Sequence, residues 1–189
     1  MAARKAPLIR GYREADMGAT PLEELARRLR EALEADQKAP KTRQHYAWGA
    51  KQAIAEIEAI GDPRKYFPGD GDRLKLGAVK MSIDGGLSAP IFWSLKPYEN
   101  RPGFHGEQRI PDSAFARVAR RAHELGWQLG IHTMGDAATV MVVNELEKIL
   151  AAAPRADHRH YLHHVAVLPP EETVKKMARL PIMVASQPG

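Results

Sequence analysis

Lysine and histidine side chains, which can bind metal ions, stand in three short segments in the second half of the sequence. Lys80 lies in GAVKMSI, His132 ends WQLGIH, and His164 ends HYLHH. Each segment has the pattern of a β-strand, whose period of two places every second side chain on the same face. In parallel α/β folds, ligands and metals are bound where such strands end. The sequence therefore predicts that three successive strands bring Lys80, His132 and His164 to one site.

Each of these residues also has a simpler interpretation. Lys80 is compatible with a surface lysine on an edge strand, and His132 with a hydrogen-bonded cap of the following helix. The histidines of DHRHYLHHV are compatible with a polar strand end in which they cluster by chance. Short motifs of this kind are individually weak. Together they favour a shared site, because their spacing repeats with the strand-helix unit and not with the helix turn.

The composition is typical of a soluble globular protein that forms one domain with a hydrophobic core. Of the 189 residues, 44% are hydrophobic and 27% are charged. The length is below the roughly 250 residues of a complete (β/α) barrel. No apolar run is long enough to cross a bilayer, and the first residues lack the apolar core of a signal peptide. We therefore expect a cytoplasmic protein without a membrane partner.

The cysteine count excludes sites built on thiols, and the charge pattern argues against a nucleic-acid-binding surface. Cysteine is absent, which excludes disulfides and thiolate ligands, so any metal site is built from nitrogen and oxygen ligands. The formal net charge is +5, but basic residues are interspersed with acidic ones, as in RRLREALEAD. This pattern is typical of a solvated helix surface. We therefore expect no nucleic-acid partner.

The sequence patterns predict two parts, at residues 1–70 and 71–189. The first is predicted to be a helical segment, with one helix that begins at the capping box Thr20-Pro21-Leu22-Glu23 and another at residues 42–59. The second is predicted to alternate strands at residues 77–83, 127–132, 160–165 and 182–186 with helices at residues 111–124, 136–152 and from 169. Short connections of this kind favour right-handed crossovers and a parallel sheet. The predicted class is α/β, with four strands that form either half a barrel or a small open sheet.

The motifs at these strands resemble those of amidohydrolases. The segments VKMSIDGGLS, GIHTMGDAA and HYLHHVAV, followed by ASQP, are similar to the amidohydrolase superfamily. The similarity is specifically to amidohydrolase family 3, in the group that includes the N-substituted formamide deformylases. It covers about residues 70–189. It implies a partial (β/α)8 TIM barrel with about four parallel strands, preceded by the helical segment.

The resemblance also implies a metal site. Lys80 matches the lysine that, once carboxylated by carbon dioxide, becomes an anionic ligand able to bridge two divalent metals. Carboxylation would also ease the burial that we expect for a lysine in a parallel strand. His132 and His164 match the imidazole ligands of the next two strands. One or two zinc ions would suit these nitrogen and oxygen ligands.

Three further residues are predicted to orient the ligands or to contact the substrate. Asp84 matches the aspartate of the DG turn, and Asp136 matches that of the GD turn. For Asp136, helix capping is favoured as the main role, with orientation of His132 as the alternative. His163 stands where the family usually has glutamate.

The implied activity is hydrolysis of a C–N bond in a small amide-type or formamide-like substrate by metal-activated water. Family members begin their barrel with an H-x-H pair and use an aspartate on the last strand as the general base. No H-x-H pair precedes Lys80, because His158 and His160, which have this spacing, enter the third strand. The sequence also ends before the strand that would carry the aspartate, so the catalytic residue is unknown. We expect an internal fragment that associates with itself or with a complementary chain, because half a barrel leaves strand edges open. The alternative is a non-catalytic remnant that serves as an interaction or regulatory subunit.

A long loop is predicted between residues 85 and 109, at the carboxyl end of the strand that carries Lys80. Its aromatic residues are Phe92, Trp93, Tyr98 and Phe104. Loops in this position often shape a binding pocket. The same aromatic residues are compatible with a loop that packs on itself, and the sequence leaves both interpretations open.

Overall fold

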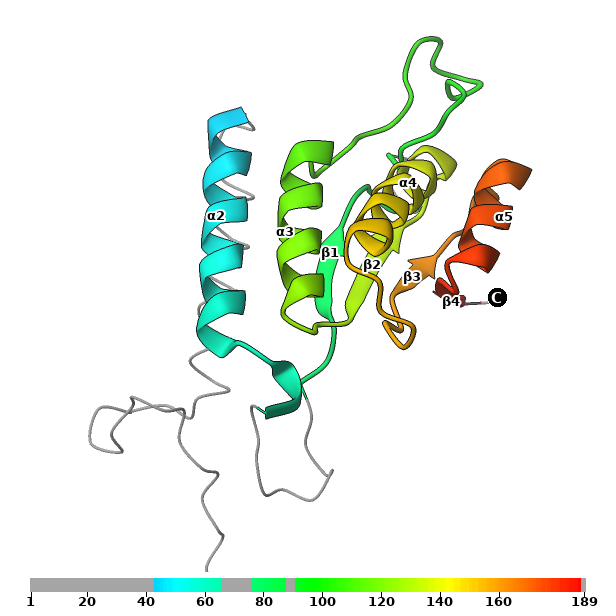
Figure 1. Ribbon diagram of the computed structural model, residues 1–189. Coiled ribbons are helices and arrows are strands. Elements are labelled where there is room, and N and C mark those ends of the chain that lie inside the picture. The colour runs from blue at the N-terminus through cyan, green and yellow to red at the C-terminus, as the bar shows by residue number, and fades with distance from the viewer. Residues whose placement is uncertain (1–42, 66–75, 88–90, 188–189) are drawn as a thin grey trace, which may run out of the picture. The chain divides into compact units, whose positions relative to one another are not determined.

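Two compact units make up the chain, with the boundary between Leu76 and Gly77. The computed structural model, shown in Figure 1, describes residues 43–65, 76–87 and 91–187. No helix within these ranges is long and apolar enough to span a membrane.

The first unit is helical in the part that the structure describes. Helix α2 spans Arg43–Ile60, and the short 3-10 helix η2 spans Pro63–Lys65. Gly61 ends α2 with a φ of 71°, a left-handed conformation that favours glycine at this position. The helix predicted at residues 42–59 is confirmed. The helix predicted to begin at Thr20 lies outside the described residues.

A four-stranded parallel sheet and three helices form the second unit. The strands lie in the order β1-β2-β3-β4 and are β1 (Val79–Ser82), β2 (Leu129–Thr133), β3 (Tyr161–His164) and β4 (Met183–Ala185). The helices between them are α3 (Asp112–Glu124), α4 (Asp136–Ala152) and α5 (Glu171–Arg179). The predicted alternation of strands and helices is confirmed, and the bounds agree closely with the predicted ones.

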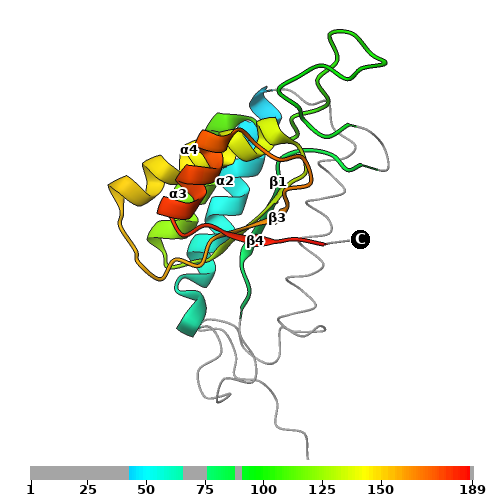
Figure 2. The ribbon, with the colours of Figure 1, turned by 90° about the vertical axis from the view of Figure 1, so that its right-hand side faces the viewer.

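The three helices of this unit lie on one face of the sheet, as Figure 2 shows. The strand order follows the chain order, so every strand-helix-strand connection runs in the same direction across the sheet. Each helix therefore packs beside the previous one. A doubly wound sheet instead reverses its strand order and carries helices on both faces. The arrangement is that of a segment of a (β/α) barrel, which confirms the α/β class and favours the partial barrel over the open sheet.

The hydrophobic core lies between these helices and the sheet. On α3, apolar side chains recur at helical spacing and point to the sheet, whereas those on the opposite side are charged. The largest apolar side chains without solvent exposure are Phe115, Ile83, Leu129, Ile131, Leu146 and Leu162. Burial of one such side chain stabilises a protein by about 1.5–3 kcal/mol. This layer therefore fixes the position of the strands.

Helices α3, α4 and α5 leave the opposite face of the sheet uncovered. Residues paired across parallel strands share a face, and the register pairs Ser82 with His132 and His132 with His163. The face contains Lys80, Ser82, Gly130, His132, Tyr161, His163, Met183 and Ala185. On the helix side, Ile131 and Leu162 have no exposed surface. Of the predicted site residues, Lys80, His132 and His163 therefore share the uncovered face.

Candidate functional site

Lys80 lies on this uncovered face, in the middle of β1. The register pairs it with Gly130 and pairs Ser82 with His132, so the Lys80 backbone lies two residues before the level of His132. Its side chain is exposed, so the burial expected from the sequence is not found among the described residues. Enough protein nevertheless surrounds the side chain that desolvation lowers the pKa of its ammonium group.

Two adjacent histidines end β3, and the backbone conformation brings both toward His132. His163 pairs with His132, so these two residues share the uncovered face. A strand of regular period would turn His164 to the helix side, but φ is 73° at His164 and 52° at Val165, both left-handed. With this backbone, the ring centroids of His164 and His132 lie 4.7 Å apart in an edge-to-face arrangement. The structure therefore brings together the two histidines that the sequence predicts as ligands.

The surroundings of His132 determine which ring nitrogen is available to a ligand. Its Nε2 lies 3.4 Å from the carbonyl oxygen of Gly85 and 3.5 Å from Oδ1 of Asp84. Burial lowers the pKa of the imidazole, and the charges of His164 and Lys80 lower it further. The Gly85 carbonyl and Asp84 act in the opposite direction. We assign the proton of the neutral ring to Nε2, which faces the two oxygens, so the lone pair is on Nδ1.

The positive charges of the basic side chains at this end of the sheet lower the pKa values of the neighbouring histidines His132 and His163. Burial lowers the pKa of His163, and so do the positive charges of three neighbours, Lys80, His164 and His132. Neutral imidazoles have lone pairs that can bind a metal ion. In the part of the chain that the structure describes, however, no group of three or more His, Cys, Asp or Glu side chains is arranged to hold a metal. Among the described residues, the predicted ligands are the imidazoles of His132 and His164 and the lysine Lys80.

Asp84 is fully buried beside His132 and accepts three backbone hydrogen bonds. The donors are the N–H groups of Trp93 at 3.1 Å, Met134 at 2.9 Å and Gly135 at 2.7 Å. The last two donors directly precede α4, whose N-cap residue is Gly135. The Asp84 carboxylate thus fixes the turn that leads from β2 into α4.

Asp136, the first residue of α4, binds a different segment. Its Oδ1 accepts hydrogen bonds from the N–H groups of Ala137 and Leu95, both at 2.9 Å. The N-cap residue is Gly135 and no side-chain cap bond is formed, so the predicted capping role of Asp136 is wrong: its carboxylate lies one position too late, inside the first turn of α4. The bond from Leu95 attaches the long loop after β1. Of the two aspartates, Asp84 is the one whose Oδ1 lies 3.5 Å from Nε2 of His132.

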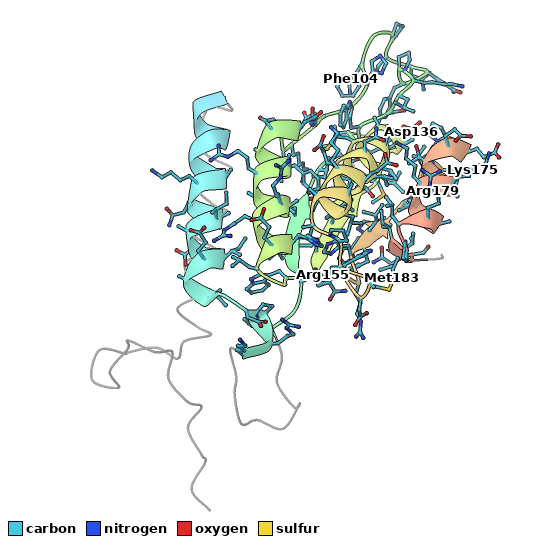
Figure 3. All side chains as sticks on the ribbon, viewed as in Figure 1. Phe104, Asp136, Arg155, Lys175, Arg179 and Met183 are labelled. Atoms are coloured by element: carbon cyan, nitrogen blue, oxygen red, sulfur yellow. The ribbon has the colours of Figure 1, made fainter. Side chains whose placement is uncertain are left out.

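The segment Ile91–Arg109, here called the aromatic loop, projects from the carboxyl end of β1 and carries Phe104, which is labelled in Figure 3. The ring centroid of Tyr98 lies 4.9 Å from that of Phe92 and 5.4 Å from that of Phe104. The Tyr98 hydroxyl donates to the Phe92 carbonyl oxygen at 2.8 Å, and the guanidinium of Arg101 lies 3.8 Å from the Phe104 centroid. These three rings therefore pack on one another, one of the two arrangements that the sequence left open.

A second group of histidines, which sequence reasoning did not identify as a unit, lies at the amino end of β3. In this buried histidine network of His123, His158 and His160, Nδ1 of His160 accepts a hydrogen bond from the Leu129 N–H at 3.1 Å. Nε2 of His160 lies 2.9 Å from Nδ1 of His123, and Nε2 of His123 lies 2.7 Å from the Ala153 carbonyl oxygen. Both rings therefore carry their proton on Nε2 and donate along one chain of hydrogen bonds.

Two rings of this network, those of His160 and His123, are held in the neutral form. Burial is the main cause that lowers the pKa of His160 to about 2, with further contributions from the charges of His158, His123 and Arg155. Burial also lowers the pKa of His123. Arg155, labelled in Figure 3, donates to the carbonyl oxygens of His123 and Trp127 at 3.0 and 2.6 Å. The histidine-rich pattern was visible in DHRHYLHHV, but no local signal separated the core histidines from those of the site.

Solved structures place this fold among metal-dependent hydrolases. Two structures, each described as an uncharacterized metal-dependent hydrolase, come from Pyrococcus furiosus, at 22% sequence identity, and from Pyrococcus horikoshii OT3, at 25%. Each superposes with a TM-score of 0.58 and covers 72% of this chain and 26% of its own. In TIM-barrel proteins the functional residues lie at the carboxyl ends of the strands, as the polar residues of this site do.

The chain belongs to the amidohydrolase family, whose sequence profile matches residues 7–189. This match confirms the resemblance to amidohydrolase family 3, whereas the N-substituted formamide deformylase subtype stays a prediction. The putative amidohydrolase YtcJ of Bacillus subtilis (strain 168) is 32% identical over 118 residues, which are 62% of this chain and 22% of that protein. Protein LONG AFTER FAR-RED 3 of Arabidopsis thaliana is 29% identical over 115 residues, 61% of this chain and 20% of that protein. The chain thus spans only about a fifth of these relatives.

Proposed function

We propose that this chain is part of a metal-dependent hydrolase that cleaves the C–N bond of small amide-type substrates, with Lys80, His132 and His164 as metal ligands. The observation that carries the proposal is the 4.7 Å approach of the His132 and His164 rings from two neighbouring strands. Membership of the amidohydrolase family supports hydrolysis. The two hydrolases of the same fold, which are described as metal-dependent, support a divalent metal.

The described donors fit zinc when Lys80 supplies an anionic oxygen. Zinc takes four ligands from imidazole nitrogens and carboxylate-type oxygens, and His132 and His164 supply two neutral nitrogens. Attack of the neutral Lys80 amine on carbon dioxide forms an N–C bond and releases one proton, which gives an anionic carbamate with two oxygens. Because Lys80 is exposed, its amine is accessible to carbon dioxide.

Residues around the ligands prepare them for this role. A bound divalent ion lowers the pKa of its water and polarises a substrate carbonyl. The Gly85 carbonyl and Asp84 hold the His132 proton on Nε2, which leaves Nδ1 free for binding. The aromatic loop returns to the same end of the sheet, where Gln108 pairs with Asp84, and in this proposal it borders the substrate.

Zinc content tests this proposal. The full chain, produced with zinc and bicarbonate, is expected to retain about one zinc ion or more per polypeptide by elemental analysis. A variant with His132→Ala and His164→Ala is expected to bind zinc at least about tenfold more weakly, because it lacks both imidazole donors. Lys80→Ala is expected to remove any dependence of the zinc content on bicarbonate.

His105→Ala serves as the matched control, because His105 is an exposed histidine of the aromatic loop that pairs with the Ser94 carbonyl oxygen. It is expected to retain zinc like the wild type. Zinc content that is equal in the double variant and in the wild type would contradict the proposed ligands. A wild-type chain without zinc would instead favour a non-catalytic remnant that keeps the fold.

A further inference from the structure

Asp84 joins two segments that are far apart in the sequence. One carboxylate accepts hydrogen bonds from Trp93 in the aromatic loop and from Met134 and Gly135 in the turn between β2 and α4. The side chain has no exposed surface. Hydrogen bonds to a charged and buried acceptor are among the stronger ones in proteins. The loop and the turn are therefore held by a single side chain.

The same two segments are also in direct contact. A Cβ atom at Gly135 would overlap the carbonyl oxygen of Trp93, so the turn has a glycine where the loop backbone approaches it. Next to this contact, the Leu95 N–H donates to Asp136 at 2.9 Å. The Asp84 bonds thus lie at the centre of a tightly packed junction between the aromatic loop and the start of α4.

The aromatic loop is closed at its base and along its length. The Arg109 N–H donates to the Ile83 carbonyl oxygen at 2.7 Å, and the Glu107 N–H donates to the Ile91 carbonyl oxygen at 2.9 Å. Further out, the Ser94 N–H donates to the His105 carbonyl oxygen at 2.8 Å. Together with the packed rings of Phe92, Tyr98 and Phe104, these bonds make the loop a compact body. Its position is then set by the junction at Asp84.

His132 lies near the end of β2, separated by Thr133 from the turn that Asp84 holds. Its Nε2 lies 3.5 Å from Oδ1 of Asp84 and 3.4 Å from the Gly85 carbonyl oxygen, which belongs to the residue after Asp84. The carboxylate that attaches the aromatic loop is therefore also adjacent to the imidazole ring. Loss of the Asp84 charge therefore changes the surroundings of the aromatic loop and those of the His132 ring at the same time.

We propose that Asp84 is a positioning residue that locks the aromatic loop onto the β2–α4 turn and holds the His132 ring in one orientation. The loop is then a fixed wall of the site and does not open as a lid. The link to metal binding rests on the proposed function, whereas the lock itself is a property of the fold.

Nuclear magnetic resonance of the full chain tests the lock without any metal. Asp84→Asn keeps the shape of the side chain but replaces one acceptor oxygen with a donor group. In this variant, amide hydrogen exchange at Trp93, Met134 and Gly135 is expected to be at least about tenfold faster, because bonds to a charged acceptor are lost. The ring 15N signals of His132 are expected to change from a single Nε2–H form to a mixture of tautomers.

Asp157→Asn is the matched control, since Asp157 is an exposed aspartate whose partner is Arg159. It is expected to leave exchange at the junction and the His132 signals unchanged. Unchanged exchange at Trp93 in Asp84→Asn would overturn the lock. Faster exchange together with an unchanged His132 spectrum would overturn the positioning of His132.

A zinc titration separates this inference from the proposed function. When the wild type binds zinc, Asp84→Asn is expected to bind it about 10–100-fold more weakly, and equal affinity would overturn the positioning role. When the wild type binds no zinc, the proposed function fails. The exchange rates and the His132 ring signals still show whether Asp84 holds the aromatic loop and the His132 ring.

Asp136→Ala covers the case in which Asp84→Asn does not fold. Asp136 is partly exposed, and its loss removes the bond from Leu95 but none of the Asp84 bonds. Exchange at Leu95 is expected to be faster while Trp93 keeps its protection. Equal loss of protection at Trp93 would show that Asp84 does not hold the loop, and would overturn the proposal.

Discussion

A decrease in pH from 7 to 5 is expected to lower the free energy of unfolding of the second unit by about 2 kcal/mol through His160 alone. The folded state holds the pKa of His160 at about 2, far below the value of 6.5 for an unperturbed histidine. Between pH 6.5 and 5, each pH unit changes the free energy of unfolding by about 1.36 kcal/mol for such a group. The lowered pKa of His123 acts in the same direction.

The sign of this effect follows from the direction of the pKa shift. The unfolded chain binds a proton at His160 below pH 6.5, whereas the folded chain does so only near pH 2. The stability is therefore fully present above pH 6.5 and is lost as the pH falls toward 2. The structural reason is that Nδ1 of His160 already accepts the Leu129 N–H, so a second ring proton would break that bond.

Urea unfolding of the full chain at pH 7.5 and pH 5.0 measures the effect. His160→Asn cannot titrate in this range and is expected to show a clearly smaller difference between the two pH values. The exposed-site variant His105→Ala is expected to keep the wild-type difference. The same pH dependence in His160→Asn and in the wild type would show that the network is not its source.

Phe115→Ala is expected to lower the free energy of unfolding by about 3–5 kcal/mol. Phe115 lies on the side of α3 that faces the sheet and has no exposed surface. Its truncation removes apolar contacts and leaves a cavity that the packed layer fills only in part. Urea unfolding at pH 7.5 measures the change, and a total loss of the cooperative transition counts as the same outcome.

Leu168→Ala is the control for this substitution, because the Leu168 side chain is 79% exposed. Its expected effect is within about 0.5 kcal/mol of zero. A loss in Phe115→Ala as small as that of the control would mean that α3 does not hold its part of the core in solution.

The sequence predicted the fold well because the fold depends on local signals. Strand and helix patterns alternate with short connections, and Gly126, at a φ of 91°, ends the α3 region where a glycine was expected. The shared face of Lys80 and His132 follows from the period of two in each strand together with the register. The positions of Lys80, His132 and His164 on three neighbouring strands could thus be predicted before the structure.

Other features of the site depend on contacts that no local pattern contains. The left-handed backbone at His164, which brings its ring to His132, contradicts the regular strand period that the sequence favours. The three donors of Asp84 come from positions 9, 50 and 51 residues away. The burial of His160 depends on α3, which supplies His123 as its partner.

The long-range bonds of Asp84 have a consequence for folding kinetics. The turn that opens α4 obtains its carboxylate from a residue 50 positions upstream, so the chain must close a large loop before this bond can form. Contacts of such high sequence separation slow the search for the native state. Helix α4 and strand β1 are consequently expected to become stable in one cooperative step, with the carboxyl end of the sheet as the last region to order.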